Sequence, residues 1–255
     1  MGSSMRGVAR RLSLDVALLA SFSTLYMVIL KMLPGIPAIG FPGVKIEIAI
    51  ALSPIYGLIL GHVLGPASIF LGTIMAMTLL PGKYTLFSYV TIFAAPLSAL
   101  VSSLVLDRGR LLGVPKWVYA VGIHGAMLAI WYATDVGRLI AIFTIYYIAS
   151  MALILASGLL GQAGSWIRRS MFRIFAGCFS GIFADHFYGS LAAIIVFRYA
   201  LNSFEPEAMA AWYLAAIPAV ALERGLMIIF SFIVAFNLYL LLRRSRYLRV
   251  RVDSA

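Results

Sequence analysis

The sequence predicts an all-α polytopic membrane protein in which residues 1–255 form a single integral membrane domain. Of the 255 residues, 63% are hydrophobic and only 11% are charged, whereas charged residues make up about a quarter of a typical soluble domain. Apolar stretches long enough to cross a bilayer recur from one end of the chain to the other. No segment is polar enough to form a sizeable soluble domain.

Eight membrane spans are expected from these apolar stretches. The first carries no small-residue cleavage site, so it is interpreted as a retained helix and not as a signal peptide. The last is longer than one straight crossing requires, and Pro218 offers it an internal start. The expected spans are residues 14–33, 46–64, 66–81, 85–106, 114–133, 138–163, 171–198 and 211–242.

The basic residues alternate between the two sides of these spans. With the N-terminus inside, fourteen of the twenty Lys and Arg residues lie on the inner side. This is the positive-inside pattern, and it predicts a cell membrane protein with both termini in the cytoplasm. The net charge of +11 is therefore interpreted as a topology signal, and no nucleic-acid partner is expected. The inner basic residues are Arg6, Arg10, Arg11, Arg108, Arg110, Lys116, Arg168, Arg169, Arg173, Arg243, Arg244, Arg246, Arg249 and Arg251.

Residues 57–66, GLILGHVLGP, place a glycine at every fourth position. This spacing marks one stripe of a helix, and small residues let membrane helices approach each other closely. Pro66 suits the first turn of a new helix. We therefore expect one short helix to end here and another to begin with almost no loop. Gly177 and Gly181 repeat the spacing on a later span.

Three outer connections are expected between the spans. Residues 34–45 contain three prolines and three glycines and cannot form a regular helix. Residues 81–85, PGKYT, form a short turn, and residues 202–218 form a longer connection with amphipathic character.

Several ionisable residues fall within the predicted spans, where they are costly and usually face the protein interior or a cavity. Because the chain has no His-Glu-x-x-His helix and a single cysteine, Cys178, no metal site is expected. No cofactor is predicted, and no nucleotide-binding motif is present, so the chain cannot hydrolyse ATP by that route. His62 and His124 are expected to be structural. The candidates are Glu47, His62, His124, Asp185, His186, Glu223 and Arg224.

Two adjacent pairs among these residues need partners. Neighbouring helical residues diverge by about 100°, so neither Asp185 with His186 nor Glu223 with Arg224 is expected to pair. Each is expected to meet another helix or a ligand, although mutual pairing that stabilises the fold is the plainer alternative. Counting back from Arg243 places Glu223 and Arg224 at the outer membrane interface.

Residues 46–77, IEIAIALSPIYGLILGHVLGPASIFLGTIMAM, resemble the second and third helices of the S components of energy-coupling factor (ECF) transporters. In that family a short helix ends in a Gly-x-x-x-Gly-Pro-like turn, and the next helix starts at the proline. The Pro/Gly-rich loop 34–45 and the basic inner loop 107–110, DRGR, resemble the family pattern as well. The final helix of the family often begins with Ile-Pro, here Ile217-Pro218.

The resemblance covers residues 12–110 and 171–246 and implies an S-component-like six-helix core. Residues 114–163 then form an extra helical hairpin inserted between the two parts. Helix 1 of the family often carries Ala-x-x-x-Ala, which contacts the coupling subunit. Ala17 and Ser21 match that pattern in part.

The resemblance implies the substrate-capture subunit of an ATP-driven importer for a vitamin or cofactor precursor, and not an enzyme. The implied partners are a transmembrane coupling subunit, two ATPase subunits, a small vitamin-like ligand and the lipid bilayer. Aromatic side chains would stack on a flat ring, and charged groups would orient its polar atoms. The implied ligand-binding residues are Phe41, Lys45, Glu47, Lys83, Tyr84, His186, Trp212, Tyr213, Glu223 and Arg224.

Three other functions remain open. A stand-alone, proton-coupled secondary transporter would use Asp185, His186 or Glu223, and an inverted repeat would favour it; no convincing repeat is evident. An intramembrane enzyme would use the same three residues and would turn over substrate without partners. The chain could also serve purely as a structural membrane protein.

Overall fold

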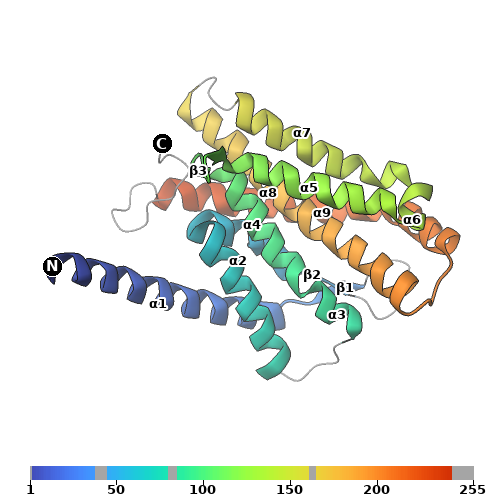
Figure 1. Cartoon of the computed structure of the whole chain (residues 1–255), viewed down its shortest axis with the longest axis horizontal. Helices are drawn as coiled ribbons and strands as arrows, with labels where there is room; N and C mark the ends of the chain where they lie inside the picture. Colours follow the sequence, from blue (N-terminus) through green and yellow to red (C-terminus); the bar gives the residue numbers. More distant parts are fainter. Residues whose placement is uncertain (1, 38–44, 80–84, 161–164, 243–255) are drawn as a thin grey trace.

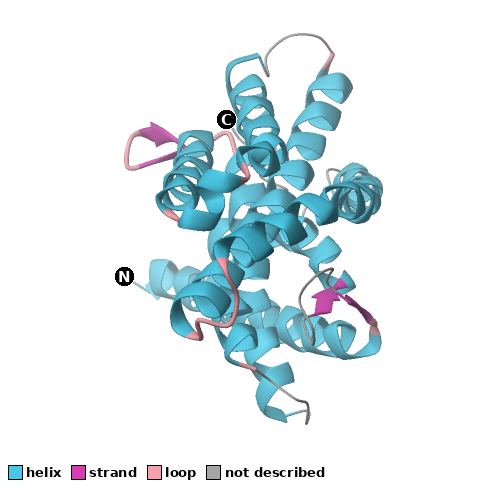
Figure 2. Ribbon diagram, turned by 90° about the vertical axis from the view of Figure 1, so that its right-hand side faces the viewer, coloured by secondary structure: helices cyan, strands magenta, loops and turns pink. Residues whose placement is uncertain are grey.

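The computed structural model describes residues 2–37, 45–79, 85–160 and 165–242, and most of them are helical (Figure 1). Two short strand pairs lie against the helical body (Figure 2). The elements are, in chain order, α1 (Gly2–Met32), β1 (Gly35–Pro37), β2 (Lys45–Glu47), η1 (Ile48–Leu52), α2 (Ser53–Leu79), α3 (Leu86–Val90), η2 (Thr91–Phe93), α4 (Ala94–Leu106), β3 (Arg110–Leu111), β4 (Val114–Pro115), α5 (Lys116–Ala133), α6 (Asp135–Leu139), η3 (Ala141–Thr144), α7 (Ile145–Leu160), α8 (Trp166–Ala193), the π-helix η4 (Ile194–Ala200) and α9 (Pro206–Leu242).

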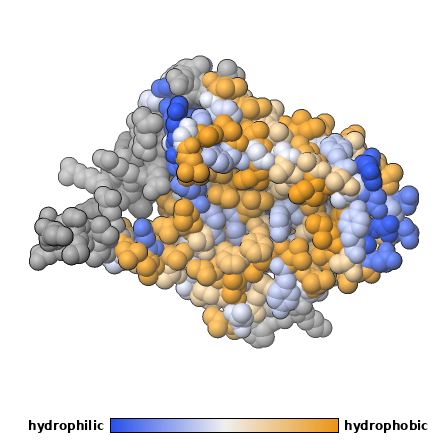
Figure 3. All heavy atoms as spheres, in the orientation of Figure 1, coloured by the Kyte–Doolittle hydropathy of each residue, from blue (hydrophilic) through white to orange (hydrophobic). Residues whose placement is uncertain are grey.

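The chain is an all-α polytopic membrane protein, as the sequence predicts. Within the described residues, six helical stretches are long and apolar enough to cross a membrane. A broad hydrophobic surface separates hydrophilic residues at the two ends of the molecule (Figure 3), as a membrane-embedded body requires. The six stretches are Leu12–Met32, Ile48–Leu79, Leu86–Leu106, Ala141–Leu159, Trp166–Ala200 and Pro206–Leu242.

Helix α2 consists of two helices that meet at Gly61. The backbone of Gly61 is non-helical, with φ 79° and ψ −170°, a conformation that favours glycine. The chain folds back here, because a Cβ on Gly65 would lie 2.9 Å from the carbonyl oxygen of Tyr56. In a straight helix these residues would be about 13 Å apart. The predicted break between two closely connected helices is confirmed, with Pro66 near the start of the second one.

The glycine stripes allow close helix packing, as predicted. A Cβ on Gly57 of α2 would collide with the carbonyl oxygen of Ala99 on α4. Gly181 of α8 lies equally close to α4, and the hydroxyl of Ser102 donates a hydrogen bond to the carbonyl of Gly177, at 2.9 Å. Small residues therefore hold α2, α4 and α8 together at the centre of the molecule.

The hairpin formed by α5, α6 and α7 belongs to the largest hydrophobic core. This core joins residues of α5 and α7 with residues of α4, α8 and α9. Trp131 of α5, Phe143 of η3 and Tyr147 of α7 are almost completely buried in it. The hairpin is thus packed into the body of the protein, which the resemblance does not lead one to expect.

The longest helix, α9, begins earlier than predicted. The sequence predicts an outer connection over residues 202–218, and this prediction is wrong in its length, since α9 starts at Pro206 and continues through Pro218. Proline lacks an N–H and removes one hydrogen bond from a helix. Packing against α7 holds α9 in place at this point, since the hydroxyl of Tyr146 donates a hydrogen bond to the carbonyl of Ile217, at 3.3 Å.

The two strand pairs close non-helical connections. Antiparallel pairing of β1 with β2 brings Gly35 opposite Glu47, so the described ends of the Pro/Gly-rich connection are not helical, as predicted, and form a strand pair that was not predicted. The β3–β4 pair turns through Leu112 and Gly113, which both have positive φ, 50° and 81°. Two consecutive positive φ angles are typical of a tight two-residue hairpin turn.

Candidate functional site

A buried ion pair joins α8 and α9. The Nη1 atom of Arg224 lies 2.9 Å from Oδ2 of Asp185, and the two side chains are 4% and 3% exposed. Arg224 lies midway along α9, about 27 Å from either end at 1.5 Å per residue. The predicted cross-helix partner of Asp185 is thus found, and it is another protein side chain. Charges at such depth are rare and usually functional.

Arg224 faces a second carboxyl group. Its Nε atom lies 3.3 Å from Oε1 of Glu223, although these two atoms do not have hydrogen-bond geometry. The prediction that Glu223 and Arg224 do not approach each other is therefore wrong, because long side chains can curl toward each other although their Cβ atoms diverge. Arg224 is 3% exposed, and the position of the two residues at the outer membrane interface stays a prediction.

His186 points into a group of aromatic rings. Its ring centroid lies 5.8 Å from that of Phe143, 6.1 Å from that of Tyr147 and 6.4 Å from that of Phe183. The Nε2 atom of His186 is buried and has no hydrogen-bond partner among the described residues. The carboxylate of the preceding residue, Asp185, instead reaches α9.

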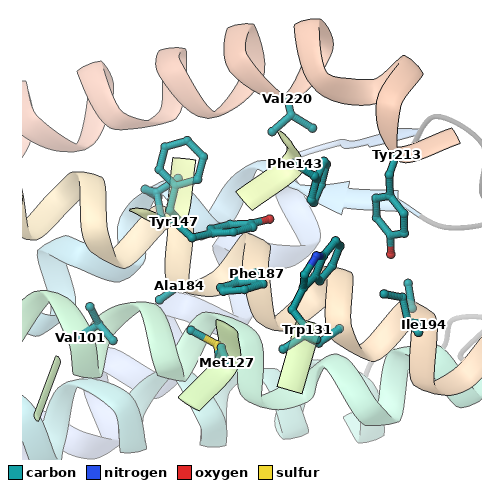
Figure 4. Close-up of a cluster of buried hydrophobic side chains, with 14 of the residues drawn as sticks. Val101, Met127, Trp131, Phe143, Tyr147, Ala184, Phe187, Ile194, Tyr213 and Val220 are labelled. Carbon is teal, nitrogen blue, oxygen red and sulfur yellow. The ribbon is translucent and has the colours of Figure 1, made fainter. Parts of the chain in front are cut away.

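Stacked aromatic rings continue from His186 across α5, α7 and α9. Tyr147 stacks on Phe187 with ring centroids 3.6 Å apart, and Trp131 stacks on Phe143 at 5.3 Å. Tyr213 of α9 meets the edge of Phe143 at 4.9 Å. In Figure 4 the indole nitrogen of Trp131 and the hydroxyl of Tyr147 point toward each other. Both atoms are buried without a hydrogen-bond partner in the described part of the chain.

Together these side chains form a site that we call the polar–aromatic cluster. Asp185 and His186 are adjacent on α8, so the ion pair of Asp185 with Arg224 adjoins the aromatic rings around His186. Aromatic walls with a few converging polar groups are typical of small-molecule sites. The polar–aromatic cluster consists of Trp131, Phe143, Tyr147, Asp185, His186, Phe187, Tyr213, Glu223 and Arg224.

Four of the ten predicted ligand-binding residues belong to this cluster, namely His186, Tyr213, Glu223 and Arg224. The other predicted residues lie elsewhere. Trp212 packs on the edge of Phe204, with centroids 4.6 Å apart.

Glu47 ends strand β2. Lys45 begins the same strand, and only its backbone is described. Phe41, Lys83 and Tyr84 lie outside the described residues.

Sequence reasoning missed the aromatic wall from the hairpin, which consists of Trp131, Phe143 and Tyr147. The resemblance to ECF S components implies that residues 114–163 are an insertion, so none of them was predicted to bind the ligand. The four-residue spacing of Phe143 and Tyr147 places both on one helical face, and this is the signal that could have indicated a shared wall.

The residues proposed for partner contact lie on α1. Ala17 and Ser21 are exposed on one side of this helix. The opposite side packs on α2, where Gly72 lies against Ser23 and Tyr26. The exposed side of α1 is available to lipid or to another membrane protein.

Three further polar clusters have structural roles. His124 is fully buried and lies 2.9 Å from the hydroxyl of Ser150, as predicted for a structural histidine. At one end of the molecule Lys116 forms an ion pair with Asp107 and lies 3.5 Å from Nδ1 of His62. Among the described residues, no group of three or more His, Cys, Asp and Glu residues could hold a metal ion.

At the opposite end, Asp135 joins α6 to η4. The Nε atom of Arg198 lies 3.0 Å from Oδ2 of Asp135, and the hydroxyl of Tyr199 donates to Oδ1 at 2.8 Å. Burial raises the pKa of Asp135, but the hydrogen bonds from Tyr199 and Arg198 outweigh it and hold the pKa below its usual value. Asp135 therefore stays ionised and ties the hairpin to the end of α8.

No protein-family model matches the chain, and no solved structure matches it. The chain is similar to the uncharacterized protein MJ0923 of Methanocaldococcus jannaschii, with 28% identity over 198 residues. The match covers 75% of this chain and 60% of that relative. The chain thus spans less than two thirds of the relative's length.

Proposed function

We propose that the chain is the substrate-capture subunit of an ATP-driven importer similar to the ECF transporters. Its substrate is a vitamin or cofactor precursor that binds in the polar–aromatic cluster. The observation that carries this proposal is a set of buried polar side-chain atoms without a hydrogen-bond partner among the described residues, of which Glu223 Oε1 and Arg224 Nε face each other as an ion pair. Such atoms are costly in a protein interior unless a ligand or water satisfies them. In the cluster they are Trp131 Nε1, Tyr147 Oη, Asp185 Oδ1, His186 Nε2, Glu223 Oε1 and Arg224 Nε.

In this proposal the chain crosses the cell membrane eight times, with the two halves of α2 and helix α5 each counted as a crossing. Both termini lie in the cytoplasm. The distribution of charge supports this orientation, because α8 begins with Arg168, Arg169 and Arg173 at the end of the molecule where α1 begins and α9 ends (Figure 1). Positive charge favours the cytoplasmic side.

The proposed partners are a transmembrane coupling subunit and two ATPase subunits. Ala17 and Ser21 form the proposed contact with the coupling subunit. Their exposure supports this assignment, since small residues on a helix surface allow a second helix to approach closely. The chain itself is not proposed to be an enzyme.

Native mass spectrometry of the full chain, purified gently from its own host membrane, tests this proposal. We expect one small heterocyclic molecule per chain, together with the coupling and ATPase subunits. Glu223→Ala should weaken retention of the molecule, whereas Arg138→Ala, at an exposed position on α6, should leave it unchanged. A chain that carries neither a ligand nor partners, and that imports substrate alone in liposomes, would contradict the proposal.

The second candidate is a proton-coupled secondary transporter. The observation that favours it is the placement of two carboxyl groups, from Asp185 and Glu223, on a single guanidinium. One of two such carboxyl groups can take up and release a proton during transport. Uptake by the purified chain in liposomes, driven by a pH gradient without ATP or partner subunits, would favour this function.

A further inference from the structure

We infer that the polar–aromatic cluster selects a positively charged ligand that carries a flat ring. This inference rests on the proposed function and adds the sign of the ligand's charge. The first argument is the charge of the site itself. Among the described side chains that line the cluster, Arg224 is the one permanent cation, and it faces the carboxyl groups of both Asp185 and Glu223. The site thus has one carboxyl group more than its cation can balance.

The buried oxygen atoms without hydrogen-bond partners also favour a positively charged ligand. Nη1 of Arg224 already donates to Oδ2 of Asp185, and each carboxyl group keeps one oxygen, Asp185 Oδ1 or Glu223 Oε1, without a hydrogen-bond partner. A cationic ligand with N–H groups would supply donors to these acceptors. An anionic ligand would have to displace Asp185 from Arg224 and leave a bare carboxylate in the protein interior.

The aromatic rings are the second, independent observation. Trp131, Phe143 and Tyr147 are each at most 1% exposed. The rings of Phe143 and Tyr147 lie next to His186, the residue that follows Asp185, and Trp131 stacks on Phe143. A cation within about 6 Å of an aromatic face is attracted by the ring quadrupole, most strongly where water is excluded. A delocalised cationic ring can also stack on these rings. The ligand class is therefore a cationic nitrogen heterocycle.

Three probes that share one ring test the charge preference of the full chain in lipid nanodiscs. They are 1-methylnicotinamide, a cation; nicotinamide, which is neutral; and nicotinate, an anion. Calorimetry or quenching of tryptophan fluorescence gives the three dissociation constants. We expect the cation to bind about tenfold or more tightly than either of the others, as desolvated cation–π contacts and one unbalanced carboxyl group allow.

Two variants test whether Glu223 causes the preference for the cation. Glu223→Gln keeps the ion pair between Asp185 and Arg224 and removes the extra carboxylate, so the preference for the cation should fall to about threefold or less. Glu207→Gln, at an exposed position in the first turn of α9, is the matched control and should leave the preference unchanged. Equal or tighter binding of nicotinate overturns the inference, as does a preference that survives Glu223→Gln.

The molecule retained by the native chain separates this inference from the proposed function. A retained cation supports both. A retained neutral or anionic molecule overturns the charge inference and leaves the capture function standing. If the native chain retains no molecule and none of the three probes binds, both fail.

Discussion

Replacing Arg224 by methionine should strongly destabilise the protein. The guanidinium lies against the carboxyl groups of both Asp185 and Glu223, and removing it leaves two uncompensated acids in the protein interior. Opposite charges about 4 Å apart attract by about 4 kcal/mol at an effective dielectric constant of about 20. Breaking a buried ion pair by removing one partner costs about 3–5 kcal/mol. We therefore expect Arg224→Met to lower the unfolding free energy by about 3–5 kcal/mol.

The double variant Asp185→Leu with Arg224→Met should recover most of this loss. A buried ion pair replaced by apolar side chains of similar volume is often neutral in stability, and only Glu223 then remains at the boundary of the cluster. We expect the double variant to lie within about 1–2 kcal/mol of the wild-type protein. It should nevertheless bind ligand more weakly, because the carboxyl group of Asp185 and the guanidinium that positions Glu223 are gone.

The measurement is reversible unfolding in mixed micelles with increasing sodium dodecyl sulfate, followed by circular dichroism. Arg138→Met, at an exposed position on α6, is the matched control and should change the unfolding free energy by less than about 0.5 kcal/mol. If Arg224→Met costs less than about 1 kcal/mol, the two carboxyl groups do not depend on the guanidinium and the reasoning is refuted. The reasoning would also be refuted if the double variant of Asp185→Leu with Arg224→Met were no more stable than Arg224→Met alone.

Three further outcomes are expected. Gly181→Val should lower the midpoint of unfolding, because the new Cβ would lie 2.7 Å from the carbonyl oxygen of Ser98 and overpacking costs about 1–3 kcal/mol. The control is Gly189→Ala, whose added Cβ would meet no neighbouring element within 4 Å, and it should not lower the midpoint. The pKa of Asp135 is depressed in the folded protein, so its contribution to stability is present above the unfolded value of about 3.9 and is lost as the pH falls through the folded value. Asp135→Asn should therefore be less stable than the wild type near neutral pH, and acid titrations should show this difference shrinking in that acidic range. Tyr147→Phe removes a buried hydroxyl without a hydrogen-bond partner among the described residues, so the unfolding midpoint should stay the same or rise. Ligand affinity should fall about five- to tenfold, because one hydrogen bond to the ligand is lost.

The features that local chemistry determines could be predicted from the sequence. The break at Gly61 follows from glycine spacing and the nearby Pro66, since both act through the backbone of their own segment. The contacts of Gly177 and Gly181 with α4 follow from the same reasoning, because a helix stripe without side chains must lie against a neighbour. The number of bilayer crossings stays a prediction.

The features that depend on which helices become neighbours could not be predicted. The sequence indicates that Asp185 needs a partner on another helix, but only packing selects Arg224 over the other basic residues. Pro218 is a strong local signal for a helix start, and tertiary contacts of the preceding residues with α7 and α8 overrule it. Trp131 joins the candidate site through the fold of the hairpin, and no spacing within the sequence relates it to Arg224.

The ion pair between α8 and α9 has a consequence for how the protein is made. The two partners are separated by 39 residues, so Asp185 is synthesised before Arg224. At about 5–20 residues per second, the acid waits a few seconds for its partner. During that time α8 is a poor membrane helix by itself, because it carries an unbalanced acid into lipid. Insertion of α8 and α9 together, as one helical pair, removes this exposure and makes the synthesis of α9 the step that completes the fold.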